Sequence, residues 1–594
     1  MRSSDRAVSG VGFRCRSNKS QGSRLKAQDG LKFQVSSLKS SQLTVLDQFF
    51  ESYYRLRPVN ATFTGVHHYD HRLPDWSPDG LGSAADEMRS LRASLLASRA
   101  PGDSLREVGV RDRELAIAFL DVQIAEHESA HFQRGNPSLA AGEALFGLIA
   151  LMTRPFAPIG QRIDAAIARL TAMPAFLADA RRSIDAGVPD EWRVRCLREC
   201  DGAARLLGEG ISRWIAIESV DDARAGYLTA SAERAGAAFE DFRRWLEGDV
   251  ASAAPDRYAC GSELFDLVLA RGHWCDRSRA SLAADARVML DEALARLDER
   301  ARQAAPGGWP EVQRRLMDTH PAVDDYLPAY TRVWNACRER AQSCDLVTWP
   351  DYPIRYVPIP LHTREAAPDL YYLFYRSPAP FDRLPVPEHV VTPIGTDTPA
   401  GEQLRRLRTT NMSVITLNHI VHHGAIGHHV QNYYAYAGES EIGRVAAVDC
   451  ASRIGMAQGG TMAEGWACYA TDLMDEVEFF TPEESVAQQH TRVRLLARAV
   501  VDIGLHERSI AFADAVAMYR ERIGMSADAA RAEACKNSMF PGTAIMYWLG
   551  SEGLHQLRRE QQRIEGDSFS LRRFHDRLLA FGSIPVPLIA QVYA

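Results

Sequence analysis

The chain has 594 residues, of which 46% are hydrophobic and 24% are charged, and its formal net charge is −7. This composition is ordinary for a soluble globular protein with a large core. The mild negative charge argues against nucleic acid as the main partner, because phosphate binding needs a basic surface.

The cysteines and the apolar runs set the expected compartment. Ten cysteines are scattered without a CxxC pair, and the closest two, Cys196 and Cys200, are one helical turn apart. We interpret them as reduced thiols and expect a cytoplasmic protein. The longest apolar run, residues 144–152, is about half as long as a membrane-spanning helix. We therefore expect no transmembrane segment and no membrane partner.

Residues 1–41 differ from the rest of the chain, being rich in Ser, Arg, Lys and Gly and poor in apolar residues. Such a segment buries too little surface to offset the entropy lost on ordering. We predict a disordered basic extension here. The Arg and Ser bias also fits a transit peptide, which is the alternative. Residues 42–594 are predicted to form one helical domain.

Helical periodicity dominates from residue 43 onward. The segment "SQLTVLDQFFESYYRLRP" predicts an amphipathic helix that ends before Pro58, because proline disfavours helix in the residue before it. Segments rich in Ala, Leu and Arg, which are strong helix formers, follow. We predict helices over residues 83–100, 110–130, 160–183, 190–217, 229–247, 260–302, 309–343, 403–437, 461–477, 482–523, 526–537 and 542–564. The predicted fold class is mainly α, one large body with a minor β-element.

That β-element is expected within residues 345–395, which are rich in proline and aromatic residues and contain short β-branched runs. The prolines confine any strands to edges or ends of a sheet. We expect a small β-element with long loops, lying beside the cleft. Tyr372 and Arg376 are candidate substrate-binding residues here, although packing is the commoner role of such a tyrosine.

The segment "NHIVHHGAIGHHVQ", residues 418–431, is rich in histidine although the whole chain has only 18. Neutral imidazole is the commonest transition-metal ligand, and a catalytic zinc ion typically takes three protein ligands. A carboxylate from elsewhere would complete such a set. Glu464, in the first turn of a predicted helix, is the candidate, although a lone glutamate there is more often a solvated residue favoured by the helix dipole.

Helical geometry leaves the choice of histidine ligands open. His422 and His429 are seven residues apart and share a face of a regular helix. His422 and His428 lie about 120° apart on a regular helix, so they converge only if the helix is distorted. Gly424 and Gly427 favour such a distortion, because glycine permits unusual backbone dihedrals.

Four motifs in order resemble the bacterial domain of unknown function 885 family, whose members are similar to helical zinc metallopeptidases. The family pattern is HExxPGHH, EGWAxY, DxGxH and PGQAxxY. The corresponding segments are "HHGAIGHH" (422–429), "EGWACY" (464–469), "DIGLH" (502–506) and "PGTAIMY" (541–547). The resemblance spans about residues 43–590, and it implies a metallopeptidase-like helical fold with a deep cleft.

Carried over by position, the resemblance implies a metal site formed by His422, His428 and Glu464, with His429 as the alternative ligand. One divalent ion is expected, zinc first, with iron or manganese as alternatives, because a His/carboxylate set suits all three. The resemblance also places Asp502 and His506 in or near the cleft. Their i, i+4 spacing suits a hydrogen bond, and a structural pair is the alternative.

The departures from the family pattern concern the reaction. His423 stands where the family has the glutamate base, and Ile426, Lys536 and Thr543 also replace family residues. Tyr547 is retained and is expected to donate a hydrogen bond to developing negative charge, unless it simply packs. Lys536 is expected to bind substrate as a point charge in place of an arginine. His423 is either a base, a direct metal ligand or an inert remnant.

These expectations give three hypotheses for function. The first is a metal-dependent hydrolase that acts on an amide or peptide-like bond in a small substrate. The second is a non-hydrolytic metalloenzyme of specialised biosynthesis, such as a lyase, cyclase or transferase, in which His423 replaces the glutamate. The third is a non-catalytic binding protein on an enzyme scaffold. In each the partner is a small molecule or a short peptide-like compound.

Overall fold

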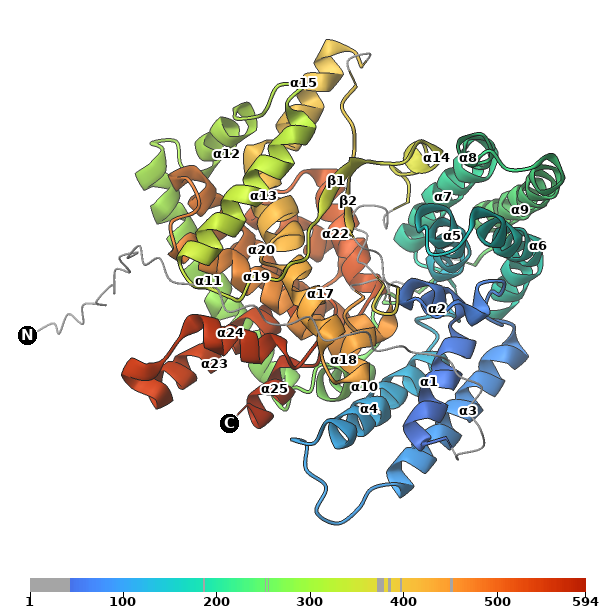
Figure 1. The fold of residues 1–594 in the computed structure, drawn as a ribbon, viewed down its shortest axis with the longest axis horizontal. Helices are drawn as coiled ribbons and strands as arrows, with labels where there is room; N and C mark the ends of the chain where they lie inside the picture. The colour runs from blue at the N-terminus through green and yellow to red at the C-terminus, as the bar shows by residue number, and fades with distance from the viewer. Residues whose placement is uncertain are drawn as a thin grey trace, which may run out of the picture.

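The computed structural model describes residues 43–184, 187–251, 253–254, 256–370, 379–382, 386–395, 398–448 and 452–593. In this part of the chain the fold is one large body of helices with a single two-stranded sheet (Figure 1). The predicted mainly α class is therefore confirmed. The predicted extension over residues 1–41 and the candidates Tyr372 and Arg376 lie outside the described residues.

The first helix is set by a cap and a proline. Thr44 accepts the N–H of Asp47, and the Asp47 carboxylate accepts the N–H of Thr44, a reciprocal cap that starts α1. The helix ends before Pro58, as predicted. The N-terminal elements are α1 (Val45–Leu56), α2 (Pro58–Thr64), η1 (His67–Tyr69), α3 (Pro78–Ala97) and α4 (Val108–Glu128).

A second group of helices stands to the right in Figure 1 and has its own apolar core. It comprises α5 (Pro137–Thr153), α6 (Ile159–Ser183), α7 (Asp190–Arg205), η2 (Leu206–Gly210), α8 (Ile211–Glu218) and α9 (Asp222–Gly248). The helix α5 was not among our predicted helices. It packs against α2, α6 and α7 and is apolar on nearly every side, so it shows no amphipathic period.

The middle of the chain is more broken than predicted. The segment predicted as one helix over 260–302 is α10 (Ser262–Leu267), η3 (Val268–Gly272) and α11 (Arg279–Ala304), and 309–343 is α12 (Trp309–Asp318) and α13 (Tyr326–Ser343). Pro321 lies in the second interruption, where it cannot donate a backbone hydrogen bond. These interruptions let α11 pack along α20 (Pro482–His506), while α13 turns toward the histidine segment.

The two strands lie within residues 345–395, as predicted. β1 (Arg355–Pro358) and β2 (Glu388–Val391) are parallel, with Tyr356 opposite His389, and α14 (Leu361–Arg364) follows β1. In Figure 1 the sheet stands between α13 and the group of helices α5–α9. His389 on β2 is 1% exposed, and its Nε2 lies 3.1 Å from Nδ1 of His419. The sheet is thus packed directly against the histidine segment.

The histidine segment itself is two helices and not one. Predicted helix 403–437 is α15 (Ala400–Thr409), α16 (Met412–Val414), η4 (Ile415–Gly424) and α17 (His428–Ala437). η4 is a π-helix, whose wider turn places side chains differently from an α-helix. Two shorter elements, α18 (Glu441–Val445) and the π-helical η6 (Gly455–Gly459), lead into α19 (Gly460–Glu476).

The C-terminal helices close the body around α19. They are α20 (Pro482–His506), α21 (Phe512–Ala517), η7 (Met518–Arg522), α22 (Ala527–Met539), α23 (Met546–Glu565), η8 (Gly566–Ser568), α24 (Leu571–Leu579) and α25 (Val586–Val592). α19 and α23 pack along each other. A Cβ atom on Gly465 would lie 2.5 Å from Cα of Gly550, so only two glycines permit this approach.

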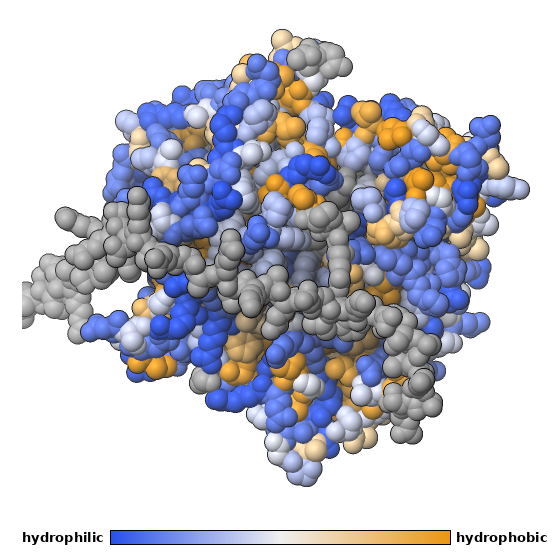
Figure 2. All heavy atoms as spheres, in the orientation of Figure 1, coloured by the Kyte–Doolittle hydropathy of each residue, from blue (hydrophilic) through white to orange (hydrophobic). Residues whose placement is uncertain are grey.

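Hydrophilic residues predominate on the face drawn in Figure 2, and hydrophobic residues occur there in scattered groups. Among the described residues, no helix combines the length and the apolar character needed to cross a bilayer. All eight cysteines in this part of the chain are free thiols.

Candidate metal centre

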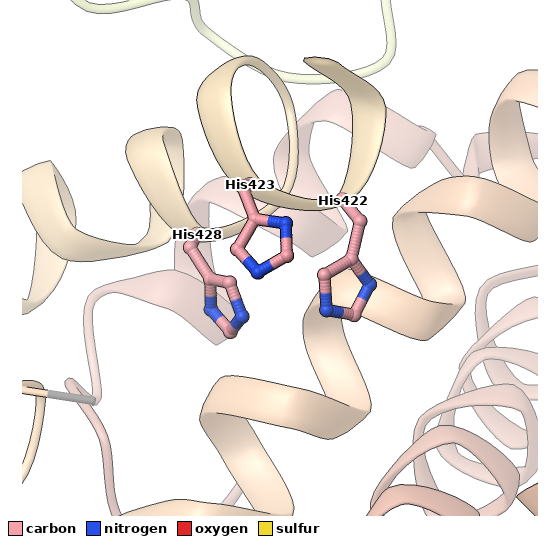
Figure 3. A group of neighbouring side chains, drawn as sticks. All are labelled: His422, His423 and His428. Atoms are coloured by element: carbon pink, nitrogen blue, oxygen red, sulfur yellow. The ribbon is translucent and has the colours of Figure 1, made fainter. Parts of the chain in front are cut away.

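Three imidazoles converge at the junction of η4 and α17. Figure 3 shows His422 and His423 projecting from the end of one helix and His428 from the start of the next, toward a common space. One nitrogen from each lies within 4.8 Å of the corresponding nitrogens of the other two. Nε2 of His422 lies 3.4 Å and Nε2 of His428 lies 3.6 Å from the same oxygen, Oε2 of Glu464. The structure therefore brings the three predicted metal ligands together.

A break of three residues makes this convergence possible. Gly427 donates its N–H to the carbonyl of Val421 at 2.9 Å, which folds the chain back on η4. A Cβ atom on Gly427 would lie 1.9 Å from the carbonyl oxygen of His422, so no other residue fits this turn. His428 therefore begins a new helix, and the 120° separation expected on a regular helix does not apply.

Two tryptophans hold the ends of the break. The indole N–H of Trp334 donates to the carbonyl of Gly424 at 2.8 Å, and that of Trp466 donates to the carbonyl of Ile426 at 2.9 Å. Both indoles are buried, so each bond satisfies a carbonyl that would otherwise be costly to bury. Trp466 is two residues from Glu464, which couples the carboxylate to the position of the histidines.

Glu464 is buried among polar partners. The hydroxyl of Tyr547 donates to Oε1 of Glu464 at 3.0 Å, while Oε2 faces His422 and His428. Burial opposes ionisation of this carboxyl, but hydrogen bonds and charge from the two histidines hold its pKa well below the usual range. Glu464 is thus an anion at neutral pH, and Tyr547 lies beside it.

His423 has one nitrogen committed to the backbone. Its Nδ1 lies 2.7 Å from the carbonyl oxygen of Asn418, so Nδ1 carries the proton and donates it. The lone pair is then on Nε2. Burial, followed by the neighbouring His422 and His428, lowers the pKa of His423 well below its ordinary value. A neutral imidazole whose lone pair is on Nε2 can bind a metal ion or accept a proton.

The remaining histidines of the segment face other partners. Nε2 of His429 donates to the carbonyl of Tyr352 at 2.7 Å, and its ring stacks on the Tyr352 ring at 4.8 Å between centroids. His429 is fully buried and is not part of the close histidine group found among the described residues. His419 contacts His389 of β2, and burial lowers the pKa of His419 to about 4.

Asp502 and His506 lie in the scaffold behind the site. The Asp502 carboxylate accepts the backbone N–H groups of Gly542, Ala544 and Ile545 at 3.2, 3.0 and 2.9 Å. It therefore fixes the turn that leads into α23 and Tyr547. Nε2 of His506 donates to the carbonyl of Asn537 at 3.1 Å and lies 3.5 Å from Asp502. Neither residue lines the cavity described next.

A cavity of about 900 Å³ opens beside the histidines. Its wall includes His422, His423, Glu464, Tyr547 and Lys536. His428 is only 3% exposed in its side chain and lies behind them. Lys536, predicted to bind substrate, thus borders the same space as the candidate metal ligands, and the volume suits a small molecule or a short peptide.

Sequence reasoning missed two cavity residues on α20. Arg494 and Arg498 line the cavity, and neither was among our candidates. A signal was present in the sequence, because Arg494, Arg498, Asp502 and His506 recur every four residues in the otherwise apolar second half of the helix. Asn418, whose carbonyl orients His423, carried no signal, since any residue supplies a carbonyl.

Comparison with solved structures shows the fold in two other bacterial proteins. A proposed lipoprotein of unknown function from Shewanella oneidensis has a TM-score of 0.72 at 19% identity, covering 92% of this chain and 98% of that one. A proposed lipoprotein from Colwellia psychrerythraea has a TM-score of 0.72 at 16% identity, covering 92% and 97%. No curated protein matches the sequence.

These neighbours correct one expectation. Both are described as lipoproteins, a class held at a membrane surface by attached lipid, so our prediction of a cytoplasmic protein is wrong on this comparison. Reduced cysteines alone were too weak a ground for it.

At the level of sequence, the family model described as bacterial protein of unknown function DUF885 matches residues 58–592. The chain therefore belongs to the DUF885 family, as the four motifs indicated.

Proposed function

We propose that this protein is a metal-dependent enzyme that hydrolyses an amide or peptide-like bond in a small substrate. The observation that carries the proposal is the convergence of His422, His428 and Glu464 beside a cavity of about 900 Å³, whose wall includes His422 and Glu464. Imidazole nitrogens and a carboxylate oxygen are the donors that zinc takes in catalytic sites, and they also suit iron and manganese.

The donor chemistry fits a divalent cation. Two Nε2 atoms already face one carboxylate oxygen, and the buried carboxylate supplies a negative charge that a cation would neutralise. His422, His428 and Glu464 would hold the ion. When bound, such an ion polarises a carbonyl group and lowers the pKa of a water molecule.

The chain's own residues have distinct parts in this proposal. His423 accepts a proton on Nε2 from the attacking water, since Nδ1 is engaged with the carbonyl of Asn418. The Tyr547 hydroxyl donates to the oxygen on which negative charge develops, moving away from Glu464, to which it donates at 3.0 Å. Lys536 supplies a positive charge in the same cavity.

A second candidate is a non-hydrolytic metalloenzyme, such as a lyase, cyclase or transferase. It is favoured by the position of His423, whose ligand atom lies within 4.8 Å of those of His422 and His428. If Nε2 of His423 binds the ion, the site has three imidazoles and one carboxylate and lacks a base at the family position. A non-catalytic binding protein is the third possibility.

Metal content and the His423→Glu variant separate these functions. We expect about one zinc, iron or manganese ion per chain after refolding with metal, and less than about a tenth of that for Glu464→Ala. Retained metal in Glu464→Ala overturns the ligand set. If His423 is only a base, His423→Glu keeps its metal and increases cleavage of a peptide panel. If His423 is a ligand, His423→Ala weakens metal binding, and no gain of cleavage in His423→Glu favours the non-hydrolytic function.

A further inference from the structure

More cationic side chains than carboxylates line the cavity. Five arginines line it, and four of them pair with a carboxylate among the described residues. These pairs are Arg296 with Glu292, Arg408 with Asp318, Arg492 with Asp472 and Arg498 with Glu533. The fifth, Arg494, makes no hydrogen bond and no ion pair within the part of the chain that the structure describes, and its Nε is fully buried.

Arg494 stands beside residues of the candidate metal centre. It is one turn from Arg498 on α20, and the guanidinium of Arg498 lies 5.0 Å from the centre of the Tyr547 ring. Its electrostatic neighbours include Tyr547 and Cys468, and Cys468 follows Glu464 by one turn on α19. Burial, and then the charge of Arg498, lowers the pKa of Arg494. The positive charge of Arg498 is thus held close to that of Arg494, which has no ion pair among the described residues.

The carboxylates close to these arginines are already engaged by other residues. Glu533 forms a two-point pair with Arg498, at 2.6 Å from Nε and 3.0 Å from the terminal nitrogen. Asp472 accepts from Gln488 at 2.9 Å and contacts His555 at 2.8 Å. Lys536 adds a third cation next to Glu533. Arg494, Arg498 and Lys536 therefore all line the cavity, and they share the charge of one carboxylate, Glu533, which does not line it.

We propose that Arg494 binds a carboxylate group of the substrate, with Lys536 and Arg498 reinforcing the positive field. A planar guanidinium offers a carboxylate two parallel N–H donors, and an arginine that has a buried Nε and no ion pair gains most from such a partner. The substrate class is thus a small acylated amino acid or short peptide acid, whose carboxylate anchors it while its amide faces His422, His423 and Glu464. The location of that amide rests on the proposed function, but the carboxylate site itself does not.

The test measures binding rather than turnover. The metal-loaded full-length chain is titrated by isothermal calorimetry with N-acetylated amino acids and dipeptides. Each acid is compared with the same compound carrying a C-terminal carboxamide. We expect each acid to bind at least about tenfold more tightly than its carboxamide. Arg494→Gln should abolish that preference, and Arg494→Lys should restore part of it. Arg296→Gln is the matched control, because Arg296 lines the same cavity but pairs with Glu292.

The outcomes separate this proposal from the proposed function. If Glu464→Ala loses metal yet keeps the Arg494-dependent preference for acids, the carboxylate site stands on its own. If the protein takes up metal as expected but shows no preference for acids over amides, the proposed carboxylate site is overturned and the proposed metal centre is not. Inorganic phosphate serves as a further probe. If phosphate binds more tightly than every acid through Arg494, the assignment to a carboxylate is overturned.

Discussion

Trp466 donates its indole N–H to the carbonyl oxygen of Ile426 at 2.9 Å, across the break between η4 and α17. Trp466 comes from the helix that carries Glu464, whereas Ile426 lies between His422 and His428. One hydrogen bond thus joins the segment that supplies the carboxylate to the segment that supplies the imidazoles. Groups of this kind, which contact no ion but orient those that do, commonly change metal affinity by about 10- to 100-fold.

Replacing Trp466 with phenylalanine should weaken metal binding without unfolding the protein. The phenyl ring keeps most of the apolar packing, but the buried carbonyl of Ile426 loses its donor, which costs about 1–3 kcal/mol. We expect metal affinity to fall by about tenfold or more. Competition with a chromophoric chelator measures it. Trp214→Phe is the control, because the buried Trp214 nitrogen has no hydrogen-bond partner in the described structure. Equal affinities for both variants would contradict the role of Trp466.

Gly427→Ala should abolish the metal site more completely. The added methyl group would lie 1.9 Å from the carbonyl oxygen of His422, so the turn has to open and His428 has to move. We expect loss of stoichiometric metal binding, measured by elemental analysis after gel filtration. Gly236→Ala in α9 is the matched control, since nothing lies within 4 Å of its added methyl group. Unchanged metal content in Gly427→Ala would refute the proposed geometry of the break.

Asp502→Ala should reduce stability but leave the metal content unchanged. Asp502 is fully buried and accepts three backbone N–H groups ahead of α23, so its removal strands three buried donors. We expect a loss of about 2–4 kcal/mol in the free energy of unfolding, measured by urea denaturation with and without metal. The exposed Asp514 provides a control substitution to alanine. Loss of metal with unchanged stability would instead place Asp502 in the metal site.

His67, which does not line the cavity and lies between two aspartates, predicts that the stability of the protein depends on pH. Nδ1 of His67 lies 2.9 Å from Asp70 and Nε2 lies 2.7 Å from Asp382. Burial opposes the charged form, but hydrogen bonds and charge from both carboxylates raise the pKa of His67 from 6.5 to about 9. The stabilisation is therefore complete below about pH 6.5 and is lost as the pH rises through about 9.

His67→Ala tests this directly. We expect the variant to be less stable than the parent by about 1–2 kcal/mol near pH 6, after allowance for the partly exposed ring, and the difference to shrink above about pH 9. Urea unfolding of the metal-free protein across this range measures it. His68→Ala, at the exposed neighbouring position, should show no such convergence. A constant difference between His67→Ala and the parent at all pH values would contradict the charged pair.

Much of the helical layout could be predicted from local signals. Pro58 ended the first helix, and the Ala-rich periodic segments formed helices. Helix α5 was missed because it is buried on nearly every side and so lacks an amphipathic period. The long segment 260–302 was predicted as one helix because its interruption at η3 depends on tertiary packing, against which local propensity is a weak guide.

The candidate site was predictable in composition and not in geometry. The motifs selected His422, His428 and Glu464, and spacing alone could not choose between His428 and His429. The choice depends on the break at Gly427, on two tryptophans from distant helices and on the carbonyl of Tyr352 that engages His429. Arg494 escaped notice because its significance is the lack of a partner, which is a property of the folded cavity.

The contact between Gly465 and Gly550 also bears on how the cavity opens. Helices that meet backbone to backbone have no layer of side chains to compress or rearrange, so α19 and α23 move as one unit. Glu464 and Tyr547, next to this contact, then keep their separation through any breathing of the protein. Elsewhere the cavity is lined by side chains from α12 and α15, including Trp309, Leu316 and Arg408, and such side chains can rearrange more easily than a backbone contact. The side of the cavity formed by α19 and α23 is thus the stiffer one, and the side formed by α12 and α15 is the more adaptable one.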